Sequence, residues 1–455
     1  MAERCEKDAT LAASFFFYRT KSDRSNARRI FPTIAYQLTK FIPSTKPAIM
    51  RTLRSDLSIL DKSLREQLQM LIIRPLVTLA EPLCTIMTVI IDALDECEDG
   101  SLLAEVISLI SEVLDDSIRI PLRFLFTSRP EAHLCHIFEN PRVTTKTRSL
   151  SLDHLDSRDS IRVYLRRGFN DTLGNQRLQS ETLCARLVDL ADGSFIYAST
   201  ALRFITENRS HNRHSHDPHT IISTLERGID SLYRRILSMH PYDDGERLII
   251  GTILLLRSHL SLADIAILLG LRPATILRAL YDLHSIFYVP DQASQPVRIF
   301  HTSLYDFLTH KQRSGPYFID PRQHHTNIAR SCLKLMTRRL KRDMMAVEDV
   351  GDMDAQQEDV EILSGDTLAG DPLVGASQYA CCFWAFHLSL ADNTTELLSD
   401  VREFALTKAL CWTEALGIIG KLGTVERSLL DAVDWLAVRF SLDIGLGRYS
   451  RFRLK

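Results

Sequence analysis

The most constraining feature of this chain is an apolar run that ends in clustered acids. Residues 86–96 read IMTVIIDALDE. A short run rich in Val, Ile and Thr is typical of a strand buried on both faces, as in a parallel sheet. In such sheets the carboxyl end of a strand opens into a crevice, so Asp92 is predicted to present its carboxylate there. The run therefore favours an α/β domain.

Short apolar runs and helical patterns alternate on both sides of this strand. Further strands are predicted at 13–18 and 122–127, with a weaker one at 147–152. Apolar residues recur at helical spacing over 27–38 and 103–114. Because strands and helices alternate, we expect a parallel sheet covered by helices.

The pattern becomes almost wholly helical after this α/β domain, which we place at residues 1–152. Two short strands, at 285–290 and 297–300, follow a compact helical stretch, which suggests a winged helix. A segment at 346–372 carries nine acids and no Lys or Arg, so it is predicted to be a solvated linker. We therefore predict three more regions, a helical domain, a winged-helix-like domain and a C-terminal helical region, at 153–220, 221–315 and 316–455.

Composition excludes several classes of function. The chain has 455 residues and a net charge of -2, and its predicted recognition helix at 273–284 is not basic, so we expect no nucleic-acid partner. No apolar run is long enough to span a membrane, and the charged N-terminus is unlike a signal peptide. Nine cysteines lie scattered without C-x-x-C pairs, which indicates reduced thiols and a cytoplasmic protein.

The acids after the strand are candidates for nucleotide chemistry. In P-loop NTPases an Asp at such a strand tip holds Mg²⁺, and Asp92 is the candidate here, with Asp95 and Glu96 placed to polarise an attacking water. Arg129, after the strand at 122–127, is suited to a γ-phosphate. The structural alternatives are a helix N-cap for Asp92 and a surface ion pair for Arg129.

The phosphate-binding half of such a site is not found in the sequence. No G-x-x-x-x-G-K-[ST] occurs, and Gly420-Lys421 is followed by Leu422. A second candidate, a metal site, involves four histidines, but a polar loop is the simpler interpretation because no Cys or acid completes a metal-binding spacing. These histidines are His211, His214, His216 and His219.

At these residues the chain resembles the NACHT domain of fungal signalling ATPases of the STAND class, the group described as nephrocystin 3-like. The resemblance rests on six motifs in order: AASFFF at 12–17, FPTIAYQL at 31–38, DALDEC at 92–97, TSRPE at 127–131, GSFIYA at 193–198 and FHTSLYDFL at 300–308. It runs to about residue 440. The fold it implies is a P-loop-NTPase-like parallel sheet, here without its first strand and phosphate loop, followed by helical and winged-helix domains.

The resemblance also implies roles and ligands, namely ATP or ADP with Mg²⁺. Asp92 matches the Mg²⁺ aspartate of the Walker B motif, Asp95 and Glu96 match the catalytic acids, and Arg129 matches the arginine that senses the γ-phosphate. His301 matches the winged-helix histidine that touches the β-phosphate of ADP. On the residues alone, a histidine beside an aromatic run is more often a satisfied core residue.

The resemblance implies a degenerate or truncated NACHT-type signalling module of an NLR-like protein, without ATPase activity by itself. The phosphate loop and its strand are expected before Met1, or were lost. Partners would be full-length relatives or a second copy. Two alternatives stay open at this point: a working ATP or GTP switch with an atypical phosphate site, and a helical interaction scaffold that binds no nucleotide.

Overall fold

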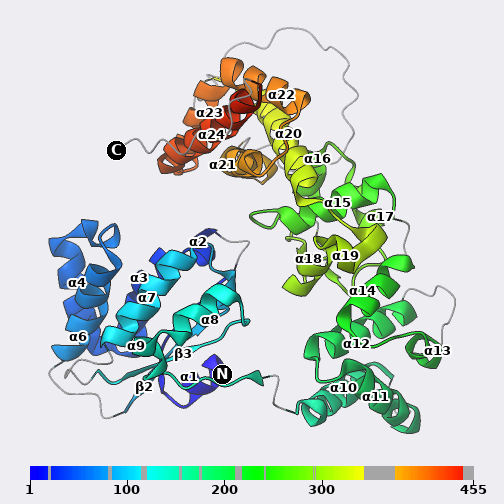
Figure 1. Ribbon diagram of the computed structural model, residues 1–455, viewed down its shortest axis with the longest axis horizontal. Coiled ribbons are helices and arrows are strands. Elements are labelled where there is room, and N and C mark those ends of the chain that lie inside the picture. Colours follow the sequence, from blue (N-terminus) through cyan, green and yellow to red (C-terminus); the bar gives the residue numbers. More distant parts are fainter. Residues whose placement is uncertain are drawn as a thin grey trace, which may run out of the picture. The chain divides into compact units, whose positions relative to one another are not determined.

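The computed structural model describes residues 1–18, 22–79, 85–113, 120–152, 156–173, 177–210, 218–239, 242–290, 292, 294–342, 373 and 375–443. The chain divides into two compact units, Met1–His154 and Leu155–Lys455 (Figure 1). The predicted acidic linker at 346–372 and three histidines of the polar loop, His211, His214 and His216, lie outside the described residues.

The first unit contains a three-stranded parallel sheet in the order β1-β2-β3. Its strands are β1 Leu11–Phe16, β2 Met87–Asp92 and β3 Leu122–Phe126. In β2 the β-branched residues Val89 and Ile91 have no exposed surface, as expected for a central strand covered on both faces. The predicted α/β arrangement is confirmed for this unit, and β1 begins two residues before the expected position.

The helices of the first unit lie before, between and after the strands in the sequence. They are α1 Ala2–Lys7, α2 Ser22–Ser25, α3 Ile30–Phe41, α4 Lys46–Ser55, α5 Leu64–Leu68, α6 Arg74–Val77, α7 Gly100–Val113, α8 Ala132–Glu139 and α9 Pro141–Thr144. The buried faces of α3 and α7 match the predicted helical spacings: Ile30, Ile34 and Leu38 on α3, and Leu103, Val106 and Ile110 on α7, are almost fully buried.

The predicted weak strand at 147–152 is wrong. The segment contains no strand, and its apolar residues Leu150 and Leu152 are 70% and 73% exposed. A strand requires a hydrogen-bonded neighbour, and an alternating pattern cannot supply one. The outer edge of β3 likewise has no strand partner among the described residues.

A glutamine side chain covers the opposite edge of the sheet. The Ser14 N–H on β1 donates to Gln37 Oε1 at 2.9 Å, and Gln37 Nε2 donates to the Ser14 carbonyl at 2.7 Å. The carboxamide from α3 thus replaces one residue of a neighbouring strand and satisfies both backbone groups.

The second unit is helical apart from one small antiparallel pair of strands. Its helices before that pair are α10 Arg158–Leu173, α11 Arg177–Ala191, α12 Phe195–Ser210, α13 Pro218–Ser223, α14 Ile229–Ser238, α15 Asp244–Leu255, α16 Leu262–Leu269 and α17 Pro273–Leu280. The pair is β4 Phe287–Tyr288 with β5 Arg298–Ile299, and Ser261 forms an isolated bridge with Pro296. Both strands lie inside the two predicted runs.

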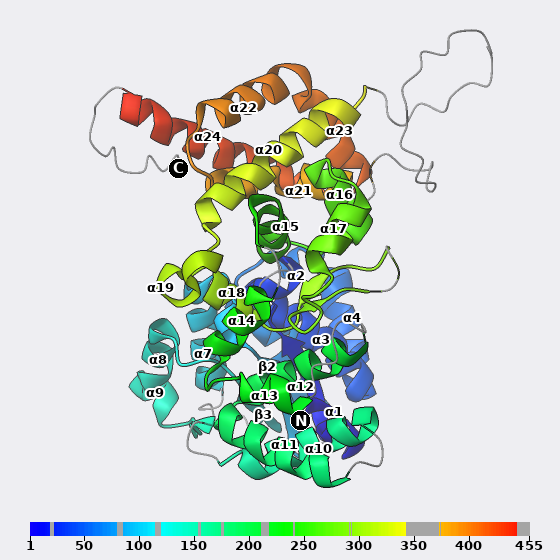
Figure 2. The same ribbon diagram turned by 90° about the vertical axis from the view of Figure 1, so that its right-hand side faces the viewer.

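The C-terminal helices pack side by side in the second unit (Figure 2). After β5 the helices are α18 Thr302–Leu308, α19 Lys311–Ser314, α20 Pro321–Arg339, α21 Ala376–Ser389, α22 Thr395–Thr407, α23 Ala409–Ile418 and α24 Val425–Asp443. Cys381 and Trp384 are buried in this core, and Cys382 is half-buried. In the part of the chain that the structure describes, we find no helix both long and apolar enough to cross a bilayer.

A close backbone approach fixes α21 against α16. Asp264 Oδ1 accepts a hydrogen bond from the Ala376 N–H at 2.9 Å, at the first turn of α21. The preceding residue, Gly375, has φ +60°, and a Cβ there would lie 1.9 Å from the same oxygen. Only glycine fits, both because of that contact and because of the positive φ.

Candidate functional site

The candidate site lies at the carboxyl ends of β2 and β3 (Figure 1). The strands are parallel, with Ile91 opposite Phe126 and Asp92 at the end of β2. Because parallel strands end at the same edge of a sheet, Asp92 and Thr127 meet there. This is the position at which the sequence predicted a carboxylate tip next to a second strand end.

Thr127 is the residue that fixes this edge. Its Oγ1 donates a hydrogen bond to Asp92 Oδ1 and accepts one from the Ala93 N–H at 3.0 Å. Its backbone N–H donates to the Ile91 carbonyl at 3.1 Å, and its carbonyl accepts from the Leu94 N–H at 3.0 Å. Four hydrogen bonds therefore hold the end of β3 against the end of β2.

The turn after β2 has an unusual backbone. Ala93 has φ 58° and ψ 54°, the left-handed conformation, which costs an L-residue about 1–2 kcal/mol. The hydrogen bond from its N–H to Thr127 and the complete burial of Leu94 oppose that cost. The turn brings Asp95 and Glu96, in the short 3₁₀ helix Leu94–Glu96, next to the strand end.

Asp95 and Arg129 form a second link between the two strand ends. The Arg129 backbone N–H donates to Asp95 Oδ1 at 3.2 Å, and Arg129 Nε lies 3.5 Å from Asp95 Oδ2. The Asp95 side chain is 9% exposed and that of Arg129 is 41% exposed. The predicted catalytic acid and the predicted γ-phosphate sensor are therefore paired with each other. This arrangement resembles the surface ion pair that was the structural alternative for Arg129.

The N-cap alternative for Asp92 is not supported. The carboxylate of Asp99, not Asp92, accepts from the N–H groups of Ser101 and Leu102 at the start of α7, each at 3.0 Å. The hydrogen bond from the Ser101 hydroxyl lowers the pKa of the Asp99 carboxyl. Asp92 therefore carries no helix-capping duty, and its carboxylate stays at the strand tip with Thr127.

The residues present fit a magnesium ion only in part. Among the described residues, no three His, Cys, Asp or Glu side chains gather in a way that could hold a metal. Mg²⁺ commonly takes one or two carboxylates and completes its shell with water and phosphate oxygens. Asp92 fits that pattern as a single protein ligand, and Glu96 lies half-buried nearby in the same loop.

His301 belongs to the second unit, so its predicted contact with a nucleotide at Asp92 stays a prediction. The side chain is exposed, unlike a core histidine, and acts as the N-cap of α18: the Ser303 N–H donates to His301 Nδ1 at 3.0 Å. The Ser303 hydroxyl lies 2.9 Å from the same nitrogen and 2.9 Å from Tyr233 Oη. Because Nδ1 accepts, a neutral His301 carries its proton on Nε2.

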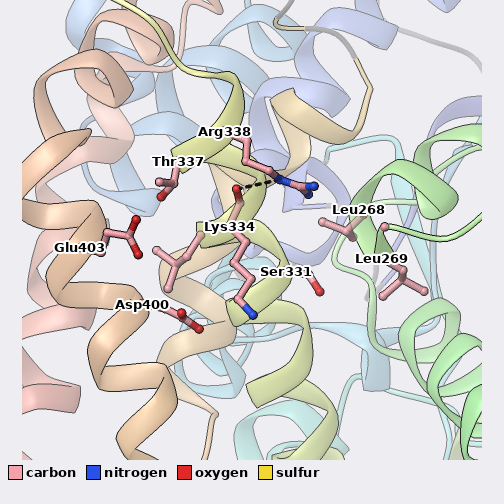
Figure 3. A pocket seen from close by; sticks show the side chains of 10 residues that line it. Leu268, Leu269, Ser331, Lys334, Thr337, Arg338, Asp400 and Glu403 are labelled. Carbon is pink, nitrogen blue, oxygen red and sulfur yellow. Dashed lines mark hydrogen bonds between the residues drawn. The ribbon is translucent and has the colours of Figure 1, made fainter. Parts of the chain in front are cut away.

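A separate pocket lies within the second unit, between α16, α20 and α22 (Figure 3). Its volume is about 470 Å³. Lys334 and Arg338 of α20 line it together with Asp400 and Glu403 of α22, and Leu268 and Leu269 of α16 lie on the other side. None of the predicted site residues lines this pocket, and its mixed charges do not select a ligand class.

The comparison with known families covers the first unit. Residues 1–129 match the family model described as Nephrocystin 3, N-terminal. The matched region contains the three strands of the parallel sheet, the acids from Asp92 to Glu96, and Arg129. A search of curated proteins returned no match. The nephrocystin 3-like resemblance is thus supported for the sheet-containing part of the chain.

Proposed function

We propose that residues 1–152 form the magnesium side of the nucleotide site of a NACHT-type signalling switch, of the STAND class found in fungal NLR-like proteins. In this proposal Asp92 is the Walker B aspartate that contacts Mg²⁺, and Asp95 and Glu96 are the acids beside the attacking water. Arg129 senses the γ-phosphate. The Nephrocystin 3, N-terminal match over residues 1–129 supports the assignment.

One observation carries the proposal: two carboxylates, Asp92 and Asp95, and the guanidinium of Arg129 lie together at the tips of two neighbouring parallel strands. Asp92 is held by Thr127, and Asp95 is held by Arg129 at 3.5 Å. A bound triphosphate with Mg²⁺ presents both charges in complementary positions, the metal to Asp92 and the γ-phosphate to Arg129. A helical scaffold without nucleotide requires neither the strained Ala93 turn nor this charge arrangement.

The proposal extends to the second unit through the helices and strands at 221–315. The order of α15, α16, α17 and the β4–β5 pair, with the Ser261–Pro296 bridge, supports a winged-helix-like domain. His301, which follows the pair, would then contact the β-phosphate of ADP through Nε2–H in the resting state. Self-association or pairing with relatives that carry a complete phosphate site is the expected readout of the switch.

We expect this chain by itself to bind nucleotide weakly and to hydrolyse it poorly. Its sequence contains no G-x-x-x-x-G-K-[ST], so no nest of loop amides and no P-loop lysine neutralise the phosphates. A phosphate that binds Arg129 through Nε would also displace Asp95 Oδ2, which lies 3.5 Å away. A dissociation constant of about 1 mM, equivalent to about 4 kcal/mol of binding free energy, is the expected scale.

Relaxation of water protons by Mn²⁺–ATP tests the proposal, because Mn²⁺ replaces Mg²⁺ and weak binding is measurable. The wild type should enhance the relaxation, and Asp92→Asn should abolish the enhancement. Asp99→Asn is the matched control, because it removes a charge from the same loop and leaves the strand tip intact. Inorganic phosphate release should stay at the buffer rate for all three proteins.

The two other outcomes refute the proposal in different ways. Micromolar binding that depends on Asp92, or turnover above the buffer rate, would establish a working switch with an atypical phosphate site. Equal enhancement by wild type and Asp92→Asn, or none by either, would leave the helical interaction scaffold.

A further inference from the structure

A chain of hydrogen bonds runs through the buried contact between α20 and α21. The Arg257 N–H donates to Tyr379 Oη at 2.9 Å, and Tyr379 Oη lies 2.7 Å from His387 Nε2. His387 Nδ1 in turn lies 2.8 Å from His325 Nδ1. His325 is 7% exposed, Tyr379 3%, and His387 not at all.

The hydrogen-bond directions in this chain follow from the donor at its start. Since Tyr379 Oη accepts from a backbone N–H, its own proton is available for His387 Nε2. His387 then carries its proton on Nδ1 and donates it to His325 Nδ1, which accepts. Both imidazoles are neutral in this arrangement, because a second proton would lie either on His325 Nδ1, facing the Nδ1–H of His387, or on His387 Nε2, facing the hydroxyl proton of Tyr379.

The surroundings of the pair oppose a positive charge. Burial is the main cause that lowers the pKa of His325, to about 4, and His324 next to it adds to the effect. Burial also lowers the pKa of His387 well below its usual value, with His325 and Arg257 as further causes. The Arg257 guanidinium lies 4.5 Å from the centre of the Phe386 ring, on the same helix as His387.

The other titratable groups buried between α20 and α21 do not compensate that charge. Tyr379 and the thiols of Cys332 and Cys381 have raised pKa values, chiefly through burial, so they stay neutral. The pKa of His324 is itself lowered, mainly by burial. In the described part of the chain, no carboxylate contributes to the pKa shift of His325 or His387.

The position of this contact gives it a mechanical role. Helix α20 ends at Arg339 and α21 begins at Ala376, so side-chain packing rather than a tight turn holds α21 on α20. Other polar links between α20 and the helices after it contain no imidazole: Arg339 Nη1 to Ser377 Oγ at 3.2 Å, the Asp392 N–H to Thr326 Oγ1 at 2.8 Å, Arg330 Nε to Asp400 Oδ2 at 2.7 Å and, just past the end of α20, Lys408 Nζ to the Leu340 carbonyl at 2.7 Å. We infer that the His325–His387 contact is an acid-sensitive latch, which holds helices α21–α24 on α20 while both rings are neutral and releases them on protonation.

The direction of the pH effect follows from the lowered pKa values. A histidine whose folded-state pKa lies below its unfolded value of about 6.5 binds a proton only after unfolding. The stabilisation is complete above pH 6.5 and is lost progressively as the pH falls towards 4, the folded-state pKa of His325. Within that window each such histidine raises the unfolding equilibrium constant about tenfold for every unit by which the pH falls.

Tryptophan fluorescence observes this part of the chain alone. The chain has three tryptophans, Trp384, Trp412 and Trp435, and they lie on α21, α23 and α24. Urea unfolding of the full chain, followed by fluorescence at pH 7.5, 6.0 and 5.0, measures the stability of these helices. We expect the urea midpoint to fall steeply between pH 6 and 5.

His325→Asn is the decisive variant, because its Oδ1 replaces Nδ1 as an acceptor for His387 and cannot be protonated in this range. We expect it to fold at pH 7.5. Its unfolding should take up about one proton fewer than that of the wild type, so its unfolding equilibrium constant should change about tenfold less per pH unit. His310→Asn, an exposed histidine in the same unit, is the matched control and should keep the full dependence. Equal pH dependence in His325→Asn and wild type would overturn the latch.

A second measurement needs no variant and applies even if His325→Asn does not fold. Hydrogen–deuterium exchange of the wild type, corrected for the intrinsic effect of pH, should show that peptides from α20 and α21 lose protection at pH 5.0. Peptides from β2 and β3 in the first unit should keep theirs. Unchanged protection of α20 and α21 at pH 5.0 would also overturn the proposal.

Discussion

Replacing Thr127 by valine should loosen the candidate site without disturbing the core. Valine has the shape of threonine and suits a strand end, so no cavity forms. The change removes the hydroxyl that donates to Asp92 and accepts from the Ala93 N–H at 3.0 Å. A hydrogen bond to a charged group contributes about 1.5–3 kcal/mol and a neutral one about 1. Thr127 is exposed, so water takes over part of both bonds and we expect a net loss of about 2 kcal/mol.

Hydrogen–deuterium exchange of peptides that cover residues 87–97 measures this loss. A change of about 2 kcal/mol corresponds to roughly 30-fold faster exchange of amides that open with the turn, such as that of Leu94. Thr127→Ser retains the hydroxyl and should stay within about threefold of wild type. Tryptophan fluorescence should not change, because all three tryptophans lie in the second unit. If valine matched wild type, or serine were as damaging as valine, the hydroxyl would not be what holds the two strand ends.

Two further changes test the edges of the same sheet. In a double-mutant cycle, Arg129→Gln and Asp95→Asn should show a coupling of about 1 kcal/mol, which is low because Arg129 is 41% exposed. Hydrogen–deuterium exchange of the β2–β3 amides measures this coupling. Additive effects of the two changes would show that the pair does not stabilise the strand ends. Gln37→Met removes both hydrogen bonds at Ser14 and should cost about 1–2 kcal/mol, with faster exchange of the Ser14 amide and a greater tendency to aggregate. Unchanged exchange at Ser14 would show that another group covers this edge.

The strands that the sequence predicted best are those whose own residues determine their burial. β2 and β3 were placed to within a residue because Val89, Ile91 and Leu122 belong to short apolar runs with few alternatives. β1 lies two residues earlier than expected, since buried Leu11 and Ala12 give no strong strand signal. The segment at 147–152 has the alternation of a strand but no neighbour, and pairing is a property of the whole fold.

The candidate site was predictable in its residues but not in its contacts. Asp92 ends a buried strand and Arg129 follows the next one, so both could be placed at strand tips from the pattern alone. Thr127 stood beside Arg129 in the same motif, yet its bond to Asp92 depends on the register that sets Ile91 opposite Phe126. No local pattern encodes a pairing between residues that lie so far apart in sequence.

The histidines at the start of α18 and at the α20–α21 contact show a second limit of sequence patterns. On the residues alone His301 resembled a core histidine, whereas it caps α18 through Nδ1 from an exposed position, and its contact with a nucleotide stays a prediction. His325 and His387 gave no signal, because a lone histidine on an apolar helix face predicts nothing about its partner. Their meaning appears only when helices from distant parts of the sequence pack together.

The links at the strand tips also bear on how tightly the proposed site can hold a nucleotide. A γ-phosphate that binds Arg129 through Nε displaces Asp95 Oδ2, and Mg²⁺ that binds Asp92 through Oδ1 replaces the hydrogen bond from the Thr127 hydroxyl. Moving the Arg129 guanidinium away from Asp95 removes a cation from beside a carboxylate that is 9% exposed, at a cost of about the 1 kcal/mol of their coupling. A ligand that displaces Asp95 from Arg129 therefore binds better when it brings a cation to this edge of the sheet. A metal-bound triphosphate does so and a free phosphate does not, so phosphate without a divalent cation should fail to compete with Mn²⁺–ATP for this edge of the sheet.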